Sequence, residues 1–235
     1  MKRFYKKAAA EPVAGMDGLY QVVLDGRPIK SPAKADLILP GKALAEAVAD
    51  EWEAQGEKIQ PAAMPLMTYV STAVDRVEPQ REAVAAEIAS FAASDLLCYR
   101  ADRQPDLVEK QEAAWTPMLQ WAENRFGGSF TVTNGIMPVA QPNTTLMLVA
   151  REVGRLDSFQ LTALHTMTTA MGSLILGFSV FDAHKTPDEA FELSLIDEDH
   201  QADLWGRDEE AEARRARLKE EVRSAQRLIS LLGTA

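Results

Sequence analysis

A change in hydrophobic pattern near residue 40 divides this sequence into a strand-like beginning and a helical remainder. Residues 19–39 contain short apolar runs separated by turn residues, and Asp25-Gly26 stands between two of those runs. Both residues of an Asp-Gly pair favour the positive φ angles of a two-residue hairpin turn. Pro28 and Pro32 restrict the flanking chain to edge strands or irregular extension. The pattern predicts a small, twisted antiparallel sheet at the N-terminus.

Helical periodicity replaces the strand pattern after the stretch "LPGK". Leu44, Val48 and Trp52 recur at intervals of four residues, which places them on one apolar face of a helix. The next stretch, "GEKIQPAAMP", contains one glycine and two prolines and is the expected hinge. We therefore predict an α+β protein with two domains. Residues 1–60 form a β-rich N-terminal domain that ends in a helix, and residues 61–235 form an α-helical domain.

Capping and stop signals divide the second part into several helices. Pro117 either kinks one helix or starts a second with Thr116 as its cap, and Gly127-Gly128 ends that region. Asn143 and Asp157 are the expected caps of the next two helices, because short polar side chains accept hydrogen bonds from the first turn of a helix.

The stretch "KTPDEAFE" is a strong signal for the start of a further helix. Thr186 is the expected cap, Pro187 takes the first helical position, and Glu189 completes a capping box. This helix should end near Trp205-Gly206. A last helix follows, with apolar residues at heptad-like spacing and charges elsewhere, so we expect it to pack on one side only.

The segment from Ser158 to Phe181 contains no acidic residue, lysine or arginine, and it is long enough to span a bilayer. Polar side chains dilute its apolar character, and no basic residues flank it closely on both sides. We expect a buried central helix and no membrane insertion. His165 in this segment is expected to be a hydrogen-bonded core residue.

The chain of 235 residues carries a formal net charge of −10. That charge repels nucleic acid and anionic lipid, which both need a basic surface, and favours a protein partner. The single cysteine, Cys98, excludes an intrachain disulfide and a cysteine-based zinc site, and its apolar neighbours predict a core position. The basic N-terminal stretch has no apolar core segment, so it is not a secretory signal, and we expect a cytoplasmic protein.

The sequence contains none of four common signatures of catalysis or nucleotide binding. The chain has no GxxxxGK[ST] loop, no GxGxxG after a strand, no HExxH and no GxSxG elbow. Its three histidines lie far apart in sequence, and His165 has no evident partner for acid–base work. The residues alone predict an interaction protein without a recognisable set of catalytic residues, and we expect no cofactor.

Residues 196–210, "IDEDHQADLWGRDEE", concentrate acidic side chains around one histidine and one tryptophan. On a helix, Asp197 and Asp203 each lie three residues from His200, so these side chains could share a metal ion and support a metal-assisted enzyme. A metal site in a helical bundle usually draws Glu-x-x-His pairs from two helices, and no second such pair exists here. A solvated surface and a face that binds a protein partner are the other two interpretations.

Six stretches carry a further signal: "RFYKKA" at 3–8, "LDGRPIKSPA" at 24–33, "LPGKALAEAVADEWEAQ" at 39–55, "MPLMTYVSTAVDRV" at 64–77, "SDLLCYRA" at 94–101 and "DLWGRDEEAEARR" at 203–215. In this order they resemble a family of ATP synthase assembly chaperones. That family binds the unassembled α subunit of the soluble catalytic head and occurs in mitochondria and in some bacteria. The resemblance covers nearly the whole chain, and the second and third stretches are its most specific part.

The resemblance implies a β-rich N-terminal domain, a larger α-helical domain and no enzymatic activity. It implies that the partner is the ATP synthase α subunit, which the chaperone shields until the β subunit replaces it. It also implies a cytoplasmic location in bacteria and the mitochondrial matrix in eukaryotic relatives. Met67 departs from the pattern, because many members carry a threonine there. We expect a monomer, since a chaperone that keeps an interface free for one partner gains nothing by covering its own.

Two regions carry the binding residues that the resemblance implies. Glu198, with Asp197 and Asp199, matches an acidic cluster just before the family's Trp-Gly pair, here Trp205-Gly206. These carboxylates would pair with arginines of the α subunit, which mainly confers specificity and a fast on-rate. Trp52 in "DEWEAQ" matches a family tryptophan, which either contacts the partner or packs in the core where the two domains join.

Overall fold

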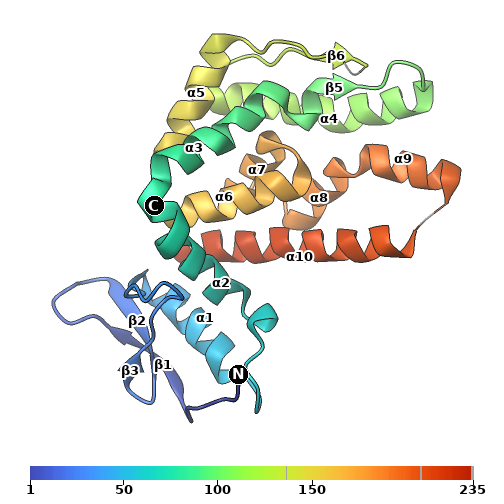
Figure 1. Ribbon diagram of the computed structural model, residues 1–235. Coiled ribbons are helices and arrows are strands. Elements are labelled where there is room, and N and C mark those ends of the chain that lie inside the picture. The colour runs from blue at the N-terminus through green and yellow to red at the C-terminus, as the bar shows by residue number, and fades with distance from the viewer. Residues whose placement is uncertain (136, 207, 234–235) are drawn as a thin grey trace. The chain divides into compact units, whose positions relative to one another are not determined.

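The structure, a computed structural model, describes residues 1–135, 137–206 and 208–233 and has the α+β architecture expected from the sequence (Figure 1). The sheet consists of β1 (Ala8–Pro12), β2 (Leu19–Leu24), β3 (Arg27–Pro28) and β4 (Leu39–Pro40). β2 is central, because it pairs antiparallel with β1 along one edge and with β3 and β4 at the two ends of the other.

The hairpin between β2 and β3 turns at Asp25-Gly26, as predicted. The φ angles are 49° at Asp25 and 78° at Gly26, which are the positive values that this turn requires. The carboxylate of Asp25 also accepts hydrogen bonds from the backbone N–H groups of Lys7, at 3.0 Å, and Lys6, at 3.1 Å. These bonds lower the pKa of Asp25. The turn therefore also fastens the chain that leads into β1.

Helix α1 (Lys42–Glu53) packs against β1 and β2. Its predicted apolar face is buried, with Leu44 and Val48 both inaccessible to solvent, and Val23 of β2 is buried as well. Trp52, the last residue of this predicted face, packs against an apolar cluster of unit 1. Its buried members are Tyr5, Ala8, Leu24, Ile59 and Met64, and Ile29, Trp52 and Met67 pack against them while partly buried.

Short helical elements follow α1. They are a 3₁₀ turn η1 (Pro61–Ala63), α2 (Pro65–Thr72), a π-helical turn η2 (Ala73–Val77), a second 3₁₀ turn η3 (Glu78–Gln80) and α3 (Arg81–Ser90). Glycine and proline thus interrupt the chain where the hinge was expected. The helix that resumes at Pro65 directs one face, with Met67, toward Trp52.

The described residues form two compact units. Unit 1 comprises Met1–Arg81, Asp157–Ala163 and the described residues from Arg227 on, and unit 2 comprises Glu82–Leu156 and Leu164–Gln226. Spatial compactness does not test whether residues 1–60 and 61–235 fold as separate domains, so that division stays a prediction.

Unit 2 is mostly helical. Its elements are η4 (Phe91–Ser94), η5 (Leu96–Cys98), β5 (Tyr99–Arg100), α4 (Pro105–Phe126), β6 (Thr133–Asn134), α5 (Asn143–Gly154), α7 (Leu174–Phe181), α8 (Pro187–Ser194) and α9 (Ile196–Trp205). Three helices, α3, α6 (Ser158–Met171) and α10 (Glu209–Leu232), contribute residues to both units. β5 and β6 pair in parallel.

Two buried polar side chains in the core of unit 2, those of Trp115 and Asp95, are hydrogen-bonded. Trp115 is inaccessible, and its Nε1–H donates to the carbonyl of Leu193 at 2.8 Å. Asp95 is also inaccessible and accepts hydrogen bonds from the Ser173 hydroxyl at 2.7 Å and from the N–H groups of Ile175 and Leu97. Burial nevertheless raises the pKa of Asp95 to about 6.

Local signals predicted several helix starts correctly and one wrongly. The capping box of Thr186 and Glu189 is present, and the Asp157 carboxylate accepts from the N–H groups of residues 159 and 160. The prediction that Asn143 caps α5 is wrong, because Pro142 occupies the cap position and Asn143 is already helical. α4 continues through Pro117 as one helix, so Thr116 caps nothing.

The segment from Ser158 to Phe181 is two helices and not one. α6 ends at Met171, Gly172 has a φ of 65°, and Ser173 caps α7. Among the described residues, no helix combines the length and the apolar character needed to cross a membrane. The prediction that His165 is a core residue is wrong. Its side chain is partly exposed and lies 3.8 Å from the carboxylate of Glu87.

The helix that begins at Pro187 does not run unbroken to residue 205. Leu195 interrupts it with a φ of −100°, which separates α8 from α9. Cys98 is buried as predicted, and burial raises its pKa to about 12, so its thiol stays protonated at neutral pH. Only one face of α10 is buried, at Val222, Ala225 and Leu228.

Candidate functional site

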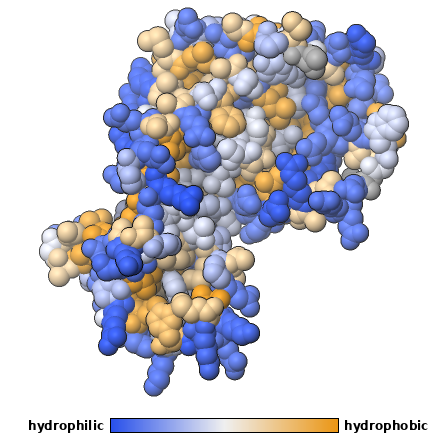
Figure 2. All heavy atoms as spheres, viewed as in Figure 1, coloured by the Kyte–Doolittle hydropathy of each residue, from blue (hydrophilic) through white to orange (hydrophobic). Residues whose placement is uncertain are grey.

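Helix α9 carries the predicted acidic site, and none of its residues is fully buried. It ends at Gly206, whose φ of 92° few other residues adopt. The last two residues of the helix, Leu204 and Trp205, are 58% and 87% exposed. In the view of Figure 2 the surface over α10, which lies beside α9 in Figure 1, is mostly hydrophilic. An apolar pair at the end of an acidic helix is therefore a local exception.

Asp197 faces inward from α9. It accepts a hydrogen bond at 2.6 Å from the side-chain amide of Gln111 on α4. Gln111 is itself buried, and its oxygen accepts from the N–H of Ala101 at 2.8 Å. This carboxylate therefore holds α9 against α4.

Arg215 of α10 forms ion pairs with the other two predicted acidic residues, Glu198 and Asp199. Its guanidinium lies 2.7 Å from Asp199 and 3.4 Å from Glu198. Burial works to lower the pKa of Arg215, but the hydrogen bonds that it donates to Asp199 and then to Glu198 outweigh burial and raise that pKa. The arginine side chain is 13% exposed, whereas Asp199 and Glu198 keep 46% and 56% of theirs in solvent. Both carboxylates are thus fixed in place and still accessible.

A cavity of about 340 Å³ lies beside these residues. Asp197, Glu198 and Arg215 line its polar side, and Leu96, Met171 and Leu218 are among its apolar lining residues. Within the described chain, no group of three or more histidine, cysteine, aspartate or glutamate side chains is arranged to hold a metal ion. The metal-assisted alternative built on His200, Asp197 and Asp203 therefore has no ligand cluster to support it.

Trp52 belongs to unit 1 and lies in different surroundings from α9. Its ring meets Tyr5 edge-on, with ring centroids 5.7 Å apart, and its carbonyl accepts the Tyr5 hydroxyl at 2.6 Å. The ring is only partly buried, yet its Nε1–H is shielded from solvent and has no acceptor among the described residues. Trp52 is therefore partly a core residue and partly the wall of an open groove.

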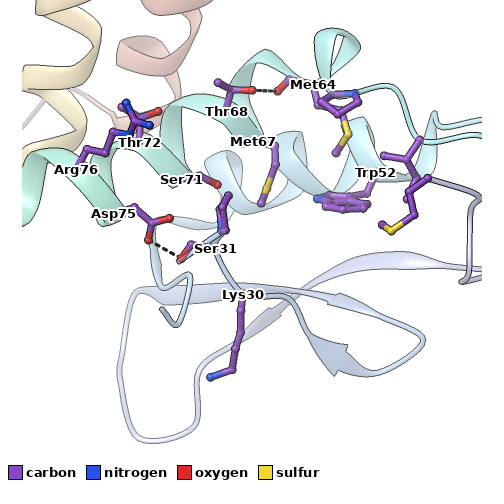
Figure 3. A pocket seen from close by; sticks show the side chains of 14 residues that line it. Lys30, Ser31, Trp52, Met64, Met67, Thr68, Ser71, Thr72, Asp75 and Arg76 are labelled. Carbon is purple, nitrogen blue, oxygen red and sulfur yellow. Dashed lines mark hydrogen bonds between the residues drawn. The ribbon is translucent and has the colours of Figure 1, made fainter. Parts of the chain in front are cut away.

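We call this concavity the α2 groove (Figure 3). It has a volume of about 500 Å³. Its lining is Met1, Lys30, Ser31, Pro32, Trp52, Ile59, Pro61, Met64, Met67, Thr68, Ser71, Thr72, Asp75 and Arg76. Sequence reasoning missed this groove. The available signal was the recurrence of Met64, Met67, Ser71 and Asp75 at intervals of three or four residues, which places them on one helical face.

Solved structures of related proteins share this fold. The crystal structure of Atp12 from Paracoccus denitrificans matches with a TM-score of 0.94 and 41% identity, over 98% of each chain. A mutant of P. denitrificans Atp12p gives the same score and identity, over 98% of this chain and 97% of that one. The Atu1473 protein of Agrobacterium tumefaciens matches with a TM-score of 0.93 and 39% identity, over 98% of this chain and 86% of that one.

A family model described as ATP12 chaperone protein also matches residues 2–123. The fold and these matches define the class of this molecule, a chaperone of ATP synthase assembly. Within that class the chain belongs to the ATP12 chaperone family. The resemblance seen in the six sequence stretches is thereby confirmed.

Proposed function

We propose that this protein binds the unassembled α subunit of ATP synthase through α9 and shields its interface in the cytoplasm until the β subunit replaces it. One observation carries this proposal. Trp205 is 87% exposed at the end of a helix whose carboxylates Glu198 and Asp199 are held by Arg215, a largely buried arginine of α10 with 13% of its side chain exposed. Tryptophan is enriched at the energetic centre of protein interfaces, where its large ring is desolvated on binding.

The charges on α9 suit a basic partner surface. Arg215 neutralises part of the charge of Glu198 and Asp199, and a chain with a net charge of −10 still attracts cations from a distance. Pairing with arginines of the partner would speed association and select the correct surface, while Trp205 and Leu204 would bury apolar area. This arrangement allows tight but reversible binding.

Such a chaperone needs no chemistry of its own. A lone α subunit exposes apolar surface meant for its neighbour, and exposed patches of that kind aggregate. Covering the patch suppresses aggregation, and a partner with higher affinity displaces the cover by mass action. The proposed protein therefore acts without hydrolysing ATP.

The test follows the aggregation of purified α subunit by light scattering, with and without this protein, and then analyses the mixture on a sizing column. We expect suppressed scattering and a co-eluting complex that disappears when β subunit is added. Unchanged aggregation together with the absence of a complex would refute the proposal and would favour an adaptor with a different partner.

Charge reversal at Glu198 locates the contact. Glu198→Lys should preserve the fold, because Asp199 still holds Arg215, and it should weaken the complex by roughly tenfold, as loss of an interfacial charge pair does. Glu109→Lys is the matched control, since Glu109 is an exposed acid on α4 of the same unit. Equal binding by the two variants would place the contact elsewhere, and a lowered melting temperature for Glu198→Lys alone would assign that residue to structure.

A further inference from the structure

The α2 groove follows one face of a continuous helical stretch, from Met64 at one end to Arg76 at the other. At 1.5 Å per residue this stretch is roughly 18 Å long. Five or six residues of extended peptide, at roughly 3.3 Å each, have the same length. The groove is therefore long enough to hold an extended chain segment of five or six residues.

The first end of the groove is apolar and adaptable. Met64 and Met67 of the α2 region and Ile59 lie beside the Trp52 ring, and Figure 3 shows Trp52, Met64 and Met67 gathered there. Methionine side chains adjust to ligands of different shape, because they are unbranched and polarizable. The buried N–H of Trp52 has no acceptor among the described residues, which is an unfavourable state that a ligand carbonyl would relieve.

The far end of the groove is polar and has one available cation. Both carboxylate oxygens of Asp75 are engaged, one by the Ser31 hydroxyl and one by the N–H of Ala33. Lys30 pairs with Asp36 at 2.9 Å, and its side chain points away from the groove in Figure 3. Arg76 is exposed and makes no ion pair with a residue that the structure describes. A carboxylate is the complementary ligand group at this end.

Backbone geometry marks the same end. Asp75 and Arg76 lie in the π-helical turn η2, and π turns inside helices occur frequently at functional sites. The hydroxyl residues Thr68, Ser71 and Thr72 line the middle, where a peptide backbone would pass. Polarity thus rises along one helical face from thioethers through hydroxyls to a guanidinium.

We propose that the α2 groove binds an extended peptide segment of the client protein. A bulky apolar residue of the segment packs against Met64, Met67 and Trp52, and an acidic residue about four positions away pairs with Arg76. A carbonyl of the bound peptide accepts a hydrogen bond from the Trp52 N–H, which has no acceptor among the described residues. The identity of the client as the α subunit rests on the proposed function, whereas the peptide chemistry rests on the groove.

Methyl NMR on protein labelled with ¹³C at its methionine methyl groups tests this inference. The probes are overlapping synthetic peptides of about twelve residues that cover the α subunit sequence. Peptides with the stated pattern should move the methyl signals of Met64 and Met67 and shift the Trp52 indole N–H signal downfield. The signal of Met147, which is 72% exposed on α5, should stay in place and is the internal control.

Variants make the assignment specific. Met67→Ala should weaken peptide binding by roughly tenfold, the loss expected for about two buried methylene-sized groups, and Met147→Ala should leave it unchanged. Arg76→Glu should weaken binding of acidic peptides and not of their amide analogues. Arg76 is exposed, so this second variant keeps the test valid even if Met67→Ala were to unfold.

The outcomes separate the groove from the proposed function. Peptides that move only the Trp205 signals would overturn the groove as a peptide site and leave the α9 proposal standing. The groove would also be overturned as a peptide site if this protein kept the intact α subunit in solution while no peptide moved any signal of the groove. Peptide binding in the groove without protection of the α subunit would support the groove and refute the proposed client.

Discussion

Glu51 of α1 holds the start of α2 in place. Its two carboxylate oxygens accept hydrogen bonds from the N–H groups of Leu66 and Met67, each at 2.8 Å. α2 has no cap of its own, because Met64 makes no side-chain bond at the cap position and Pro65 has no N–H. A carboxylate at this end of a helix also interacts favourably with the helix dipole. The side chain of one helix therefore caps another helix, and that second helix forms the wall of the α2 groove.

The contribution of Glu51 to the free energy of unfolding can be worked out from these contacts. Glu51 is buried, and each hydrogen bond to a charged acceptor contributes roughly 1.5–3 kcal/mol. Burial raises the pKa of Glu51, more than the bonds from Met67 and Leu66 lower it, so desolvation offsets part of the gain. We expect Glu51→Ala to lower the free energy of unfolding by about 3 kcal/mol, since it leaves two donors unpaired. Glu51→Gln keeps one acceptor and should cost about half of that.

Urea unfolding followed by circular dichroism measures both variants, with Glu46→Ala as the control. Glu46 lies on the same helix, is 53% exposed and pairs with Lys42 at 3.3 Å. Its removal should change the free energy of unfolding by about 0.3–0.5 kcal/mol. Equal unfolding midpoints for Glu51→Ala and Glu46→Ala would refute the assignment of Glu51 as the cap of α2. A changed slope of unfolding free energy against urea would show that the two-state comparison does not hold.

Three other perturbations have expected outcomes. Burial raises the pKa of Asp95 from 3.8 to about 6, so the folded state binds the proton of this carboxyl more tightly than the unfolded state does. The contribution of Asp95 to the free energy of unfolding therefore falls by roughly 3 kcal/mol as pH rises from about 4 to about 6. Asp95→Asn should abolish this pH dependence in urea titrations. Gly128→Ala would place a Cβ 2.7 Å from Thr145 Oγ1 and should lower the free energy of unfolding by about 1–3 kcal/mol. Gly154→Ala places its Cβ in open space on a helix and should raise the free energy of unfolding by about 0.5–1 kcal/mol. Equal melting temperatures of the two variants would contradict this expectation. Trp205→Ala should change stability by less than about 0.5 kcal/mol while weakening the proposed α-subunit complex, and retained protection from aggregation would count against α9.

The sequence predicted turns and helix caps correctly where residues adjacent in the sequence determine the local conformation. Asp25-Gly26 sets a turn by the φ angles that its two residues accept, and Thr186 with Glu189 caps a helix within four residues. Asn143 failed as a cap because Pro142, immediately before it, already has the extended conformation that the cap position requires. Rules of this kind succeed when the competing conformations also depend on neighbouring residues.

Features that join distant segments could not be predicted in this way. Glu51 caps a helix that begins fourteen residues later, and Gln111 binds Asp197 from another helix entirely. Neither contact has a periodic signature, because it depends on which helices pack together. The resemblance to a family supplied the acidic cluster, but it did not show which of its carboxylates are engaged inside the protein.

The contacts of α9 show that some of its acidic residues position the helix and others are available to a partner. One oxygen of Asp197 is occupied by Gln111, so this residue positions the helix, while Asp199 fixes Arg215 and keeps nearly half of its side chain in solvent. Glu198 has the longer contact to Arg215 and the larger exposed fraction, so it can turn toward a partner at the smallest cost. An aromatic anchor contributes most when the helix that carries it is already ordered, because less conformational entropy is lost on binding. The inward bonds of Asp197 and Asp199 therefore support the proposed contacts of Glu198 and Trp205 by holding α9 in its binding conformation before the partner arrives.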